Sequence, residues 1–439
     1  MENSGNLLTR DLLDFIAKSP DSWHAAENAA KELAAAGFEE LTEGKIWKIA
    51  AGGKYFVRRN MSSLIAFRTP KADFGGFMIA AAHGDSPLFR IKDNAEIEAG
   101  GYVKLNVEKY GGAIYSSWFD RPLSVSGRVV VKCGGAFETR LVDVGRDLLC
   151  IPSLAIHMNR SVNEGYRFRV QEDMLPLLGG EDAKGALARI VAQSAGVKPE
   201  DIAASELCVY DREAGRIWGA SEEFISSPRL DDLECVFSLM RGFLAGESAE
   251  SCGIFALLDS EEIGSGTKQG AASTFLRDTL RRIFISLGRT EEDYFAAIAS
   301  SFMLSADNAH AAHPNHMDAA DPTNRPRMNS GVVLKFSGEQ KYTTDAISAA
   351  MFRELCSRTG VPVQEYYNNS DIPGGSTLGH LSWAQVAVNM ADIGLAQLAM
   401  HSACETAGAR DPEYMAGAIR EFYSSHVEDL GGGKYILGK

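Results

Sequence analysis

Short apolar runs alternate with amphipathic stretches along much of the chain. The run at 77–82 (FMIAAA) ends abruptly in polar residues, which is typical of a buried strand that delivers polar side chains to a loop. Similar runs predict strands at 254–258, 331–336, 361–366 and 386–390, and amphipathic stretches predict helices at 22–36, 271–284 and 344–357. This alternation predicts an α/β fold with a mostly parallel sheet sandwiched by helices.

The pattern changes between residues 93 and 222, where short β-rich runs are separated by glycine turns. Strands are expected there at 126–133 and 137–142, on either side of a glycine pair. After this region the earlier pattern of strands and helices returns. We therefore expect a β-rich domain inserted at 93–222 into a discontinuous main domain made of 1–92 and 223–439.

The composition is that of a globular protein. The chain has 439 residues, of which 45% are hydrophobic and 23% charged, and disorder is excluded as its main state. No apolar run approaches the roughly 20 residues that cross a bilayer, so we expect no membrane partner. A net charge of -14 without a basic stripe excludes nucleic acid as a partner.

Two further features concern the cellular compartment. The N-terminus shows neither a secretory nor a mitochondrial leader pattern, and a cytoplasmic location is expected. The seven cysteines are scattered and include no C-x-x-C pair. This excludes a disulfide scaffold and a thiolate zinc site.

Metal-ligating side chains follow predicted strands or lie in loops bounded by Gly or Pro at five places: His83, Asp231 with Asp232, Glu261 with Glu262, Asp307, and His401. Taken singly, each is more often a turn or cap residue than a ligand. Together, two imidazoles and three carboxylates suit a pair of zinc-like ions with mixed nitrogen and oxygen ligands. If Asp231 bridges, His83 and Asp307 complete one site. Glu262 and His401 complete the other, which leaves Glu261 as a general base.

Six motifs carry a resemblance to a known family: HGDSP at 83–87, IPSLAIHMNR at 151–160, SPRLDDL at 227–233, DSEEIGSGTKQGA at 259–271, SADNAHAAHPNH at 305–316 and MHSACE at 400–405. In this order they closely resemble the aspartyl aminopeptidases, a family of two-zinc exopeptidases. The resemblance implies the two-zinc exopeptidase fold, with the insertion serving as a lid and dimerisation domain. It implies removal of N-terminal residues, preferably Asp or Glu, from peptides.

The resemblance implies a role for each residue of the constellation. The five expected ligands of two Zn²⁺ ions per subunit, which Co²⁺ or Mn²⁺ can replace, are His83, Asp231 as the bridge, Glu262, Asp307 and His401. Glu261 is the base that deprotonates the attacking water and then protonates the leaving amine. Asp85 is expected to accept the N–H of the His83 imidazole, with a turn-capping role as the alternative.

Four further residues are implied at the substrate. The resemblance implies that His157 enters the active site from a neighbouring subunit and stabilises the oxyanion, with a role as zinc ligand as the alternative. It places His310, Lys335 and Tyr342 at the substrate. A lysine within an apolar run requires a counter-charge, which an acidic substrate side chain would supply.

The histidines at 310, 313 and 316 suggest a separate metal triad, but Pro314 would break a helix that aligned them. Asp232 stands where the family usually has Asn and places negative charge near the metals.

The resemblance also implies self-association into a closed homododecamer built from dimers, which admits only short peptides. Two alternatives share the scaffold: an aminopeptidase for neutral residues and another two-metal amidohydrolase. A remote alternative is a non-catalytic assembly or cargo protein. That alternative predicts loss of a ligand or of the base, whereas all six positions are present.

Overall fold

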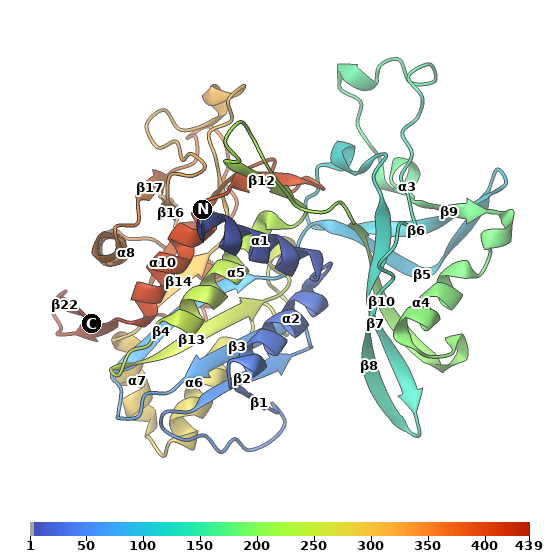
Figure 1. Cartoon of the computed structure of the whole chain (residues 1–439). Coiled ribbons are helices and arrows are strands. Elements are labelled where there is room, and N and C mark those ends of the chain that lie inside the picture. The colour runs from blue at the N-terminus through green and yellow to red at the C-terminus, as the bar shows by residue number, and fades with distance from the viewer. Residues whose placement is uncertain (1–3) are drawn as a thin grey trace.

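The computed structural model describes residues 4–439. Figure 1 shows a helix-covered sheet that carries both chain ends and, to its right, a β-rich part. The larger sheet has nine strands in the order β1 (Glu39–Leu41), β2 (Lys54–Arg59), β3 (Ser63–Arg68), β13 (Ser251–Leu258), β4 (Gly76–His83), β14 (Phe302–Ala306), β18 (Asn389–Gly394), β16 (Val332–Lys335) and β17 (Val363–Tyr366). The neighbours β13, β4, β14 and β18 run parallel at its centre.

Strand β4 shows why this sheet needs helices on both faces. Met78, Ala80 and Ala82 contribute to one hydrophobic core, whereas Ile79 and Ala81 contribute to the other. Successive side chains of a strand point to opposite faces, so a strand that is apolar at every position has two faces to bury. The expected α/β fold with a mostly parallel central sheet is confirmed.

The helices divide between these two cores. One face is covered by α1 (Ser4–Ala17), α2 (Ser22–Ala35), α5 (Leu230–Ala245), α8 (Ala346–Thr359) and α10 (Asp411–Tyr423). The other is covered by α6 (Phe275–Ser286), α7 (Glu291–Ala299) and α9 (Leu378–Ser382). Within residues 4–439 no helix combines the length and apolar character needed to cross a bilayer.

The β-rich part has a sheet and a core of its own. Its six strands follow the order β8 (Ala136–Asp143), β7 (Leu123–Cys133), β10 (Ile202–Asp211), β5 (Leu88–Ala99), β6 (Tyr102–Tyr110) and β9 (Leu177–Gly180), with helices α3 (Val170–Asp173) and α4 (Ala186–Ala195). The buried side chains of Phe89, Leu105 and Val129 lie in its core. The division at 93 and 222 stays a proposal, and the pairing of β5 favours an earlier first boundary.

A smaller sheet lies near the carboxyl ends of the central strands. It has five strands in the order β11 (Arg216–Trp218), β12 (Phe224–Ser227), β20 (Glu405–Gly408), β19 (Ala396–Leu398) and β15 (Ala309–His310), and a separate hairpin pairs β21 (His426–Asp429) with β22 (Tyr435–Gly438). Strands β12 and β20 are antiparallel, with Ser227 opposite Glu405. This pairing brings the segments before Asp231 and after His401 together.

Most predicted elements are present, with shifted ends. The helix expected at 22–36 is α2, and the strand expected at 77–82 is β4. The strand predicted at 386–390 is wrong in position, because β18 starts at Asn389. Residues 386–388 are apolar because Val386 and Val388 are buried in the second core without forming a strand.

Candidate metal centre and active site

Three neighbouring strands deliver polar side chains to one edge of the central sheet. His83 is the last residue of β4, Asp307 directly follows β14, and Glu261 and Glu262 lie in a short 3-10 helix (Glu261–Ile263) after β13. Because β4 pairs in parallel with both β13 and β14, the carboxyl ends of all three meet at this edge. Such edges are the usual position of ligand sites in open α/β sheets.

The structure brings all five expected ligands together in two groups that share Asp231. One group consists of His83, Asp231 and Asp307, and the other of Asp231, Glu262 and His401. In each group, one candidate ligand atom per residue lies within 4.8 Å of the others. This is the partition that the sequence suggested, with Asp231 between the two positions.

The spacing of these atoms suits a small cation. Asp231 lies 3.4 Å from His83 Nε2 through Oδ1 and 3.4 Å from His401 Nε2 through Oδ2. His401 Nε2 also lies 3.4 Å from Glu262 Oε1. Ligands roughly 2.0–2.2 Å from a tetrahedral zinc are separated by about 3.3–3.6 Å.

Two carboxylate oxygens strengthen this fit. Asp231 Oδ1 and Glu262 Oε1 are buried, and neither has a hydrogen-bond partner within residues 4–439. Buried oxygens without donors are costly unless a cation satisfies them. The residues present therefore fit zinc, since imidazole nitrogens and carboxylate oxygens are ligands that this metal uses.

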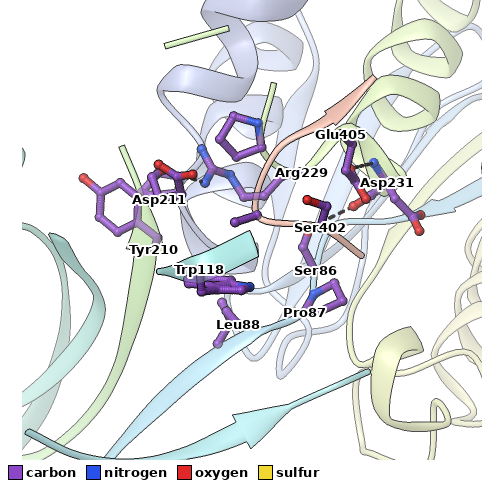
Figure 2. A pocket seen from close by; sticks show the side chains of 13 residues that line it. Ser86, Pro87, Leu88, Trp118, Tyr210, Asp211, Arg229, Asp231, Ser402 and Glu405 are labelled. Atoms are coloured by element: carbon purple, nitrogen blue, oxygen red, sulfur yellow. Dashed lines mark hydrogen bonds between the residues drawn. The ribbon is translucent and has the colours of Figure 1, made fainter. Parts of the chain in front are cut away.

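Glu405 fixes two of the ligands through their main chain. Its Oε2 accepts the Asp231 N–H at 2.9 Å and its Oε1 accepts the His401 N–H at 2.7 Å. Ser86 Oγ donates to the Asp231 carbonyl at 2.9 Å, and Figure 2 shows these contacts to Asp231 from a neighbouring pocket. Glu405 is 1% exposed. Glu405 is the last residue of the MHSACE motif, and its sequence position alone indicates no role.

Asp85 forms hydrogen bonds both to the His83 imidazole and to the turn that carries the two glutamates. His83 Nδ1 lies 3.1 Å from the main-chain carbonyl of Asp85 and 3.5 Å from its carboxylate, so the carbonyl is the hydrogen-bond acceptor. The carboxylate instead accepts the main-chain N–H groups of Glu261 at 3.1 Å and Glu262 at 3.2 Å, and the Tyr110 hydroxyl at 2.7 Å. Asp85 therefore positions the turn that carries both glutamates.

Asp232 is buried behind the ligands. Its Oδ2 accepts the main-chain N–H of His83 at 3.2 Å, and the residue is fully buried. Burial, followed by the nearby Asp307 and Asp231, raises the pKa of Asp232 well above its ordinary value. Without a cation, the uncharged acid is therefore favoured at this position.

Glu261 belongs to neither ligand group. Without a cation, burial raises the pKa of the Glu261 carboxyl to about 8, and Asp307 and Asp85 contribute. Burial alone would lower the pKa of the His401 imidazole, but Asp231 and Glu262 raise it to about 10. The extra proton on His401 competes with a cation, because metal binding requires deprotonated ligands.

A cavity of about 330 Å³ opens onto the ligands and Glu261, and His310, Lys335 and Tyr342 line it. Lys335 is 2% exposed, and its Nζ lies 3.5 Å from Asp307 Oδ1 and donates to the Asn308 carbonyl at 3.1 Å. Its Nζ also lies 5.2 Å from the centre of the Tyr342 ring. The counter-charge that Lys335 requires is therefore present within the protein.

Two sequence-predicted features lie elsewhere. His157 is exposed on a turn of the β-rich part and does not line the cavity of its own chain. His313 and His316 belong to neither ligand group found in residues 4–439, and no helix spans 310–316. The separate histidine triad is therefore not formed.

Comparison with known proteins agrees with this geometry. The model of a family described as aminopeptidase I zinc metalloprotease (M18) matches residues 15–423. A probable M18 family aminopeptidase 2 from Clostridium acetobutylicum is 45% identical over 424 residues, which cover 94% of this chain and 98% of the relative. A protein of the same description from Pseudomonas aeruginosa is 40% identical over 427 residues, covering 95% of this chain and 98% of the relative.

Solved structures show the same fold. Ape4, in its cryo-EM complex with Nbr1, matches with a TM-score of 0.93 and 35% identity over 96% of this chain and 86% of that one. The S. cerevisiae mApe1 dodecamer matches with a TM-score of 0.85 and 27% identity over 96% of this chain and 97% of that one. The chain belongs to the M18 family of zinc aminopeptidases, the family of aspartyl aminopeptidase type.

Proposed function

We propose that this aminopeptidase removes N-terminal Asp or Glu from short peptides with the help of two zinc ions. The observation that carries the proposal is the pair of ligand groups that share Asp231. Within these groups, three distances between an imidazole nitrogen and a carboxylate oxygen are 3.4 Å. Glu261 lies beside them on the same cavity.

Each residue of the centre has one proposed task. His83 and Asp307 would hold one ion, Glu262 and His401 the other, and Asp231 both. Bound zinc would act as a Lewis acid and lower the pKa of water to about 7. Asp85 keeps Glu261 and Glu262 in place through their main-chain N–H groups.

Glu261 is the proposed general base. Its carboxylate takes the proton of the attacking water and then delivers a proton to the leaving amine. Without cations the pKa of Glu261 is raised to about 8, and cations held by the adjacent ligands would lower it toward the range in which a carboxylate acts as a base. Asp85 fixes the main chain of Glu261, which limits how far its carboxylate can move from the reacting atoms.

The proposed acidic preference rests on Lys335. Its ammonium has three donors, of which one meets Asn308 and another faces Asp307. A third donor can therefore reach a substrate carboxylate within the cavity that Lys335, Tyr342 and His310 line. The internal contact with Asp307 favours a second candidate, an aminopeptidase for neutral residues, in which Lys335 only balances the charge of a ligand.

We also propose that His157 acts in the active site of a second copy. Its turn is exposed and carries the apolar side chains of Leu154, Ile156 and Met158, which are 56%, 49% and 74% exposed. A relative is solved as a dodecamer, which supports a homododecamer built from dimers. The cytoplasmic location stays a prediction from the sequence.

Aminoacyl p-nitroanilides test the activity and the acidic preference in one experiment. With zinc present we expect hydrolysis of the Asp and Glu compounds to exceed that of Leu and Ala, and a chelator should abolish all four rates. Lys335→Met should reduce kcat/KM for Asp and Glu at least tenfold, with a smaller effect on Leu. Equal effects on all four substrates would favour the neutral-residue candidate.

The role of Glu261 has a separate test. Glu261→Gln should keep the zinc content of the parent protein but lose about 10²–10⁴-fold in kcat. Metal analysis beside steady-state kinetics measures both quantities. Glu428→Gln is the matched control, because Glu428 is exposed on β21. Full activity of the Glu261 variant would refute the proposed base.

A further inference from the structure

A second cavity adjoins the catalytic one. Its volume is about 310 Å³, and His310, Tyr366 and Gly375 line both cavities. None of the five expected metal ligands lines the second cavity, and neither do Lys335 and Glu261. The second cavity therefore adjoins the site of reaction, and the charged groups of that site do not line it.

Three segments of the chain run from one cavity into the other. Residues 309 and 310 line the first, whereas residues 310, 311 and 313 line the second. Similarly, 397–399 line the second and the next two residues line the first. The loop at 374–377 contributes to both. The second cavity is thus bordered by the same segments as the first and lies where the next residue of a bound peptide would have to go.

The chemistry of the second cavity differs from that of the first. Within residues 4–439 its lining includes no Asp, Glu, Lys or Arg. Tyr367, Ile372 and Leu398 provide apolar surface, and His313 and His316 lie with their ring centres 4.9 Å apart. A charged side chain placed here would lose hydration without gaining a counter-charge, whereas an apolar or aromatic one would gain from burial.

We propose that this cavity is a subsite for the residue that follows the cleaved bond, and that it selects large uncharged side chains, aromatic ones above all. The inference rests on the proposed function, since it requires the first residue to lie between the ligands and Lys335. Successive side chains of an extended peptide point in opposite directions. The side chain of the second substrate residue therefore points away from Lys335, and the adjoining cavity provides a surface for it to pack against.

Substrates of the form Asp-X-amide test this subsite. With X as Phe, Leu, Ala, Glu or Lys, we expect kcat/KM to be at least tenfold higher for Phe than for Ala, and lowest for Glu and Lys. Aspartyl amide serves as the reference substrate, because its leaving group is ammonia and it carries no second side chain.

Two variants that place opposite charges at Ile372 provide a test that misfolding cannot explain, because they should change the order of substrates in opposite directions. Ile372 lines the cavity and is 48% exposed, so either charge is tolerated by the fold. Ile372→Glu should favour Asp-Lys-amide over Asp-Glu-amide by at least fivefold, and Ile372→Lys should reverse that order. Both variants should hydrolyse aspartyl amide at the parent rate. Ile46→Glu and Ile46→Lys are the controls, since Ile46 is 91% exposed and lines neither cavity.

The outcomes separate this inference from the proposed function. If the parent enzyme cleaves aspartyl amide but does not distinguish among the second residues, the subsite is refuted and the proposed function stands. If zinc-loaded enzyme leaves aspartyl amide intact, the proposed function itself fails. If the Ile372 variants leave the order of substrates unchanged and instead alter the mass of the assembly in light scattering, the cavity receives a second copy and the subsite is refuted.

Discussion

Glu405 holds the main chain of two expected metal ligands without being one of them. Each of its oxygens accepts one main-chain N–H, from Asp231 or from His401. Glu405→Gln replaces one acceptor by an NH₂ group that faces a donor. We expect a roughly 10–100-fold loss of zinc affinity, because residues that orient metal ligands have effects of that size. Titration of metal-free protein with zinc, followed by metal analysis, measures this change.

The effect should fall unequally on the two positions. Only one group contains His401, whereas Asp231 is common to both. We therefore expect the variant to keep about one ion at a zinc concentration that gives the parent two, with kcat reduced. Glu428→Gln again serves as the control. Unchanged zinc affinity at both positions would show that Glu405 does not position the ligands.

The convergence of the expected ligands was predictable from residue type and position in the chain. His83 and Asp307 stand at the ends of apolar runs, and the ends of neighbouring parallel strands must meet. Glu405 and Ser86 gave no such signal, because they act on main-chain groups that only the folded chain brings near them. The partner of Lys335 was hidden for the same reason, since β18 lies between the strand of Lys335 and the strand that Asp307 follows.

At the scale of elements, strand β18 forms hydrogen bonds to two segments that border the catalytic cavity. Asp392 is fully buried on this strand and accepts the Thr377 hydroxyl at 2.5 Å and the Thr343 hydroxyl at 2.6 Å. Thr377 ends the Gly-rich loop of the cavity, and Thr343 follows Tyr342. A single buried carboxylate thus holds both segments against the sheet.

Thr377→Val should make the loop at 374–377 less firmly held, and so weaken substrate binding without affecting the catalytic step. The change keeps the side-chain shape but removes a hydrogen bond to a charged group, worth about 1.5–3 kcal/mol. We expect KM for aspartyl p-nitroanilide to rise about three- to tenfold, with kcat within twofold of the parent. Steady-state kinetics measure both constants. Thr323→Val is the control at an exposed loop. A fall in kcat at constant KM would contradict a role in binding.

The order of elements followed from the sequence, whereas several ends did not. The predicted helix at 271–284 begins only at Phe275, whose free N–H the Ser273 hydroxyl accepts in the preceding turn. The run at 386–390 is apolar because its side chains pack into the second core, and only its last two residues belong to a strand. Burial and strand formation give the same pattern over a few residues, so periodicity cannot separate them.

At the scale of the whole molecule, the buried acids around the centre link stability to pH. Burial raises the pKa of Glu261 and Glu405 to about 8, that of Asp411 to about 7 and that of Asp259 to about 6. Asp231 shifts the other way, because His401 and His83 offset its burial. Without metal, the folded chain thus binds more protons than the unfolded chain between about pH 4 and pH 8.

The sign of this linkage gives a prediction for zinc. Stability falls with rising pH wherever the folded state holds more protons, so the Tm of metal-free protein should decrease from pH 5.5 to pH 8. Zinc competes with protons for the expected ligands and binds more tightly as pH rises, so its stabilisation should grow over the same interval. Scanning calorimetry at both pH values, with magnesium as the control cation, measures the two trends. A zinc-induced rise in Tm that is equal or larger at pH 5.5 would contradict a cation site made by the five expected ligands.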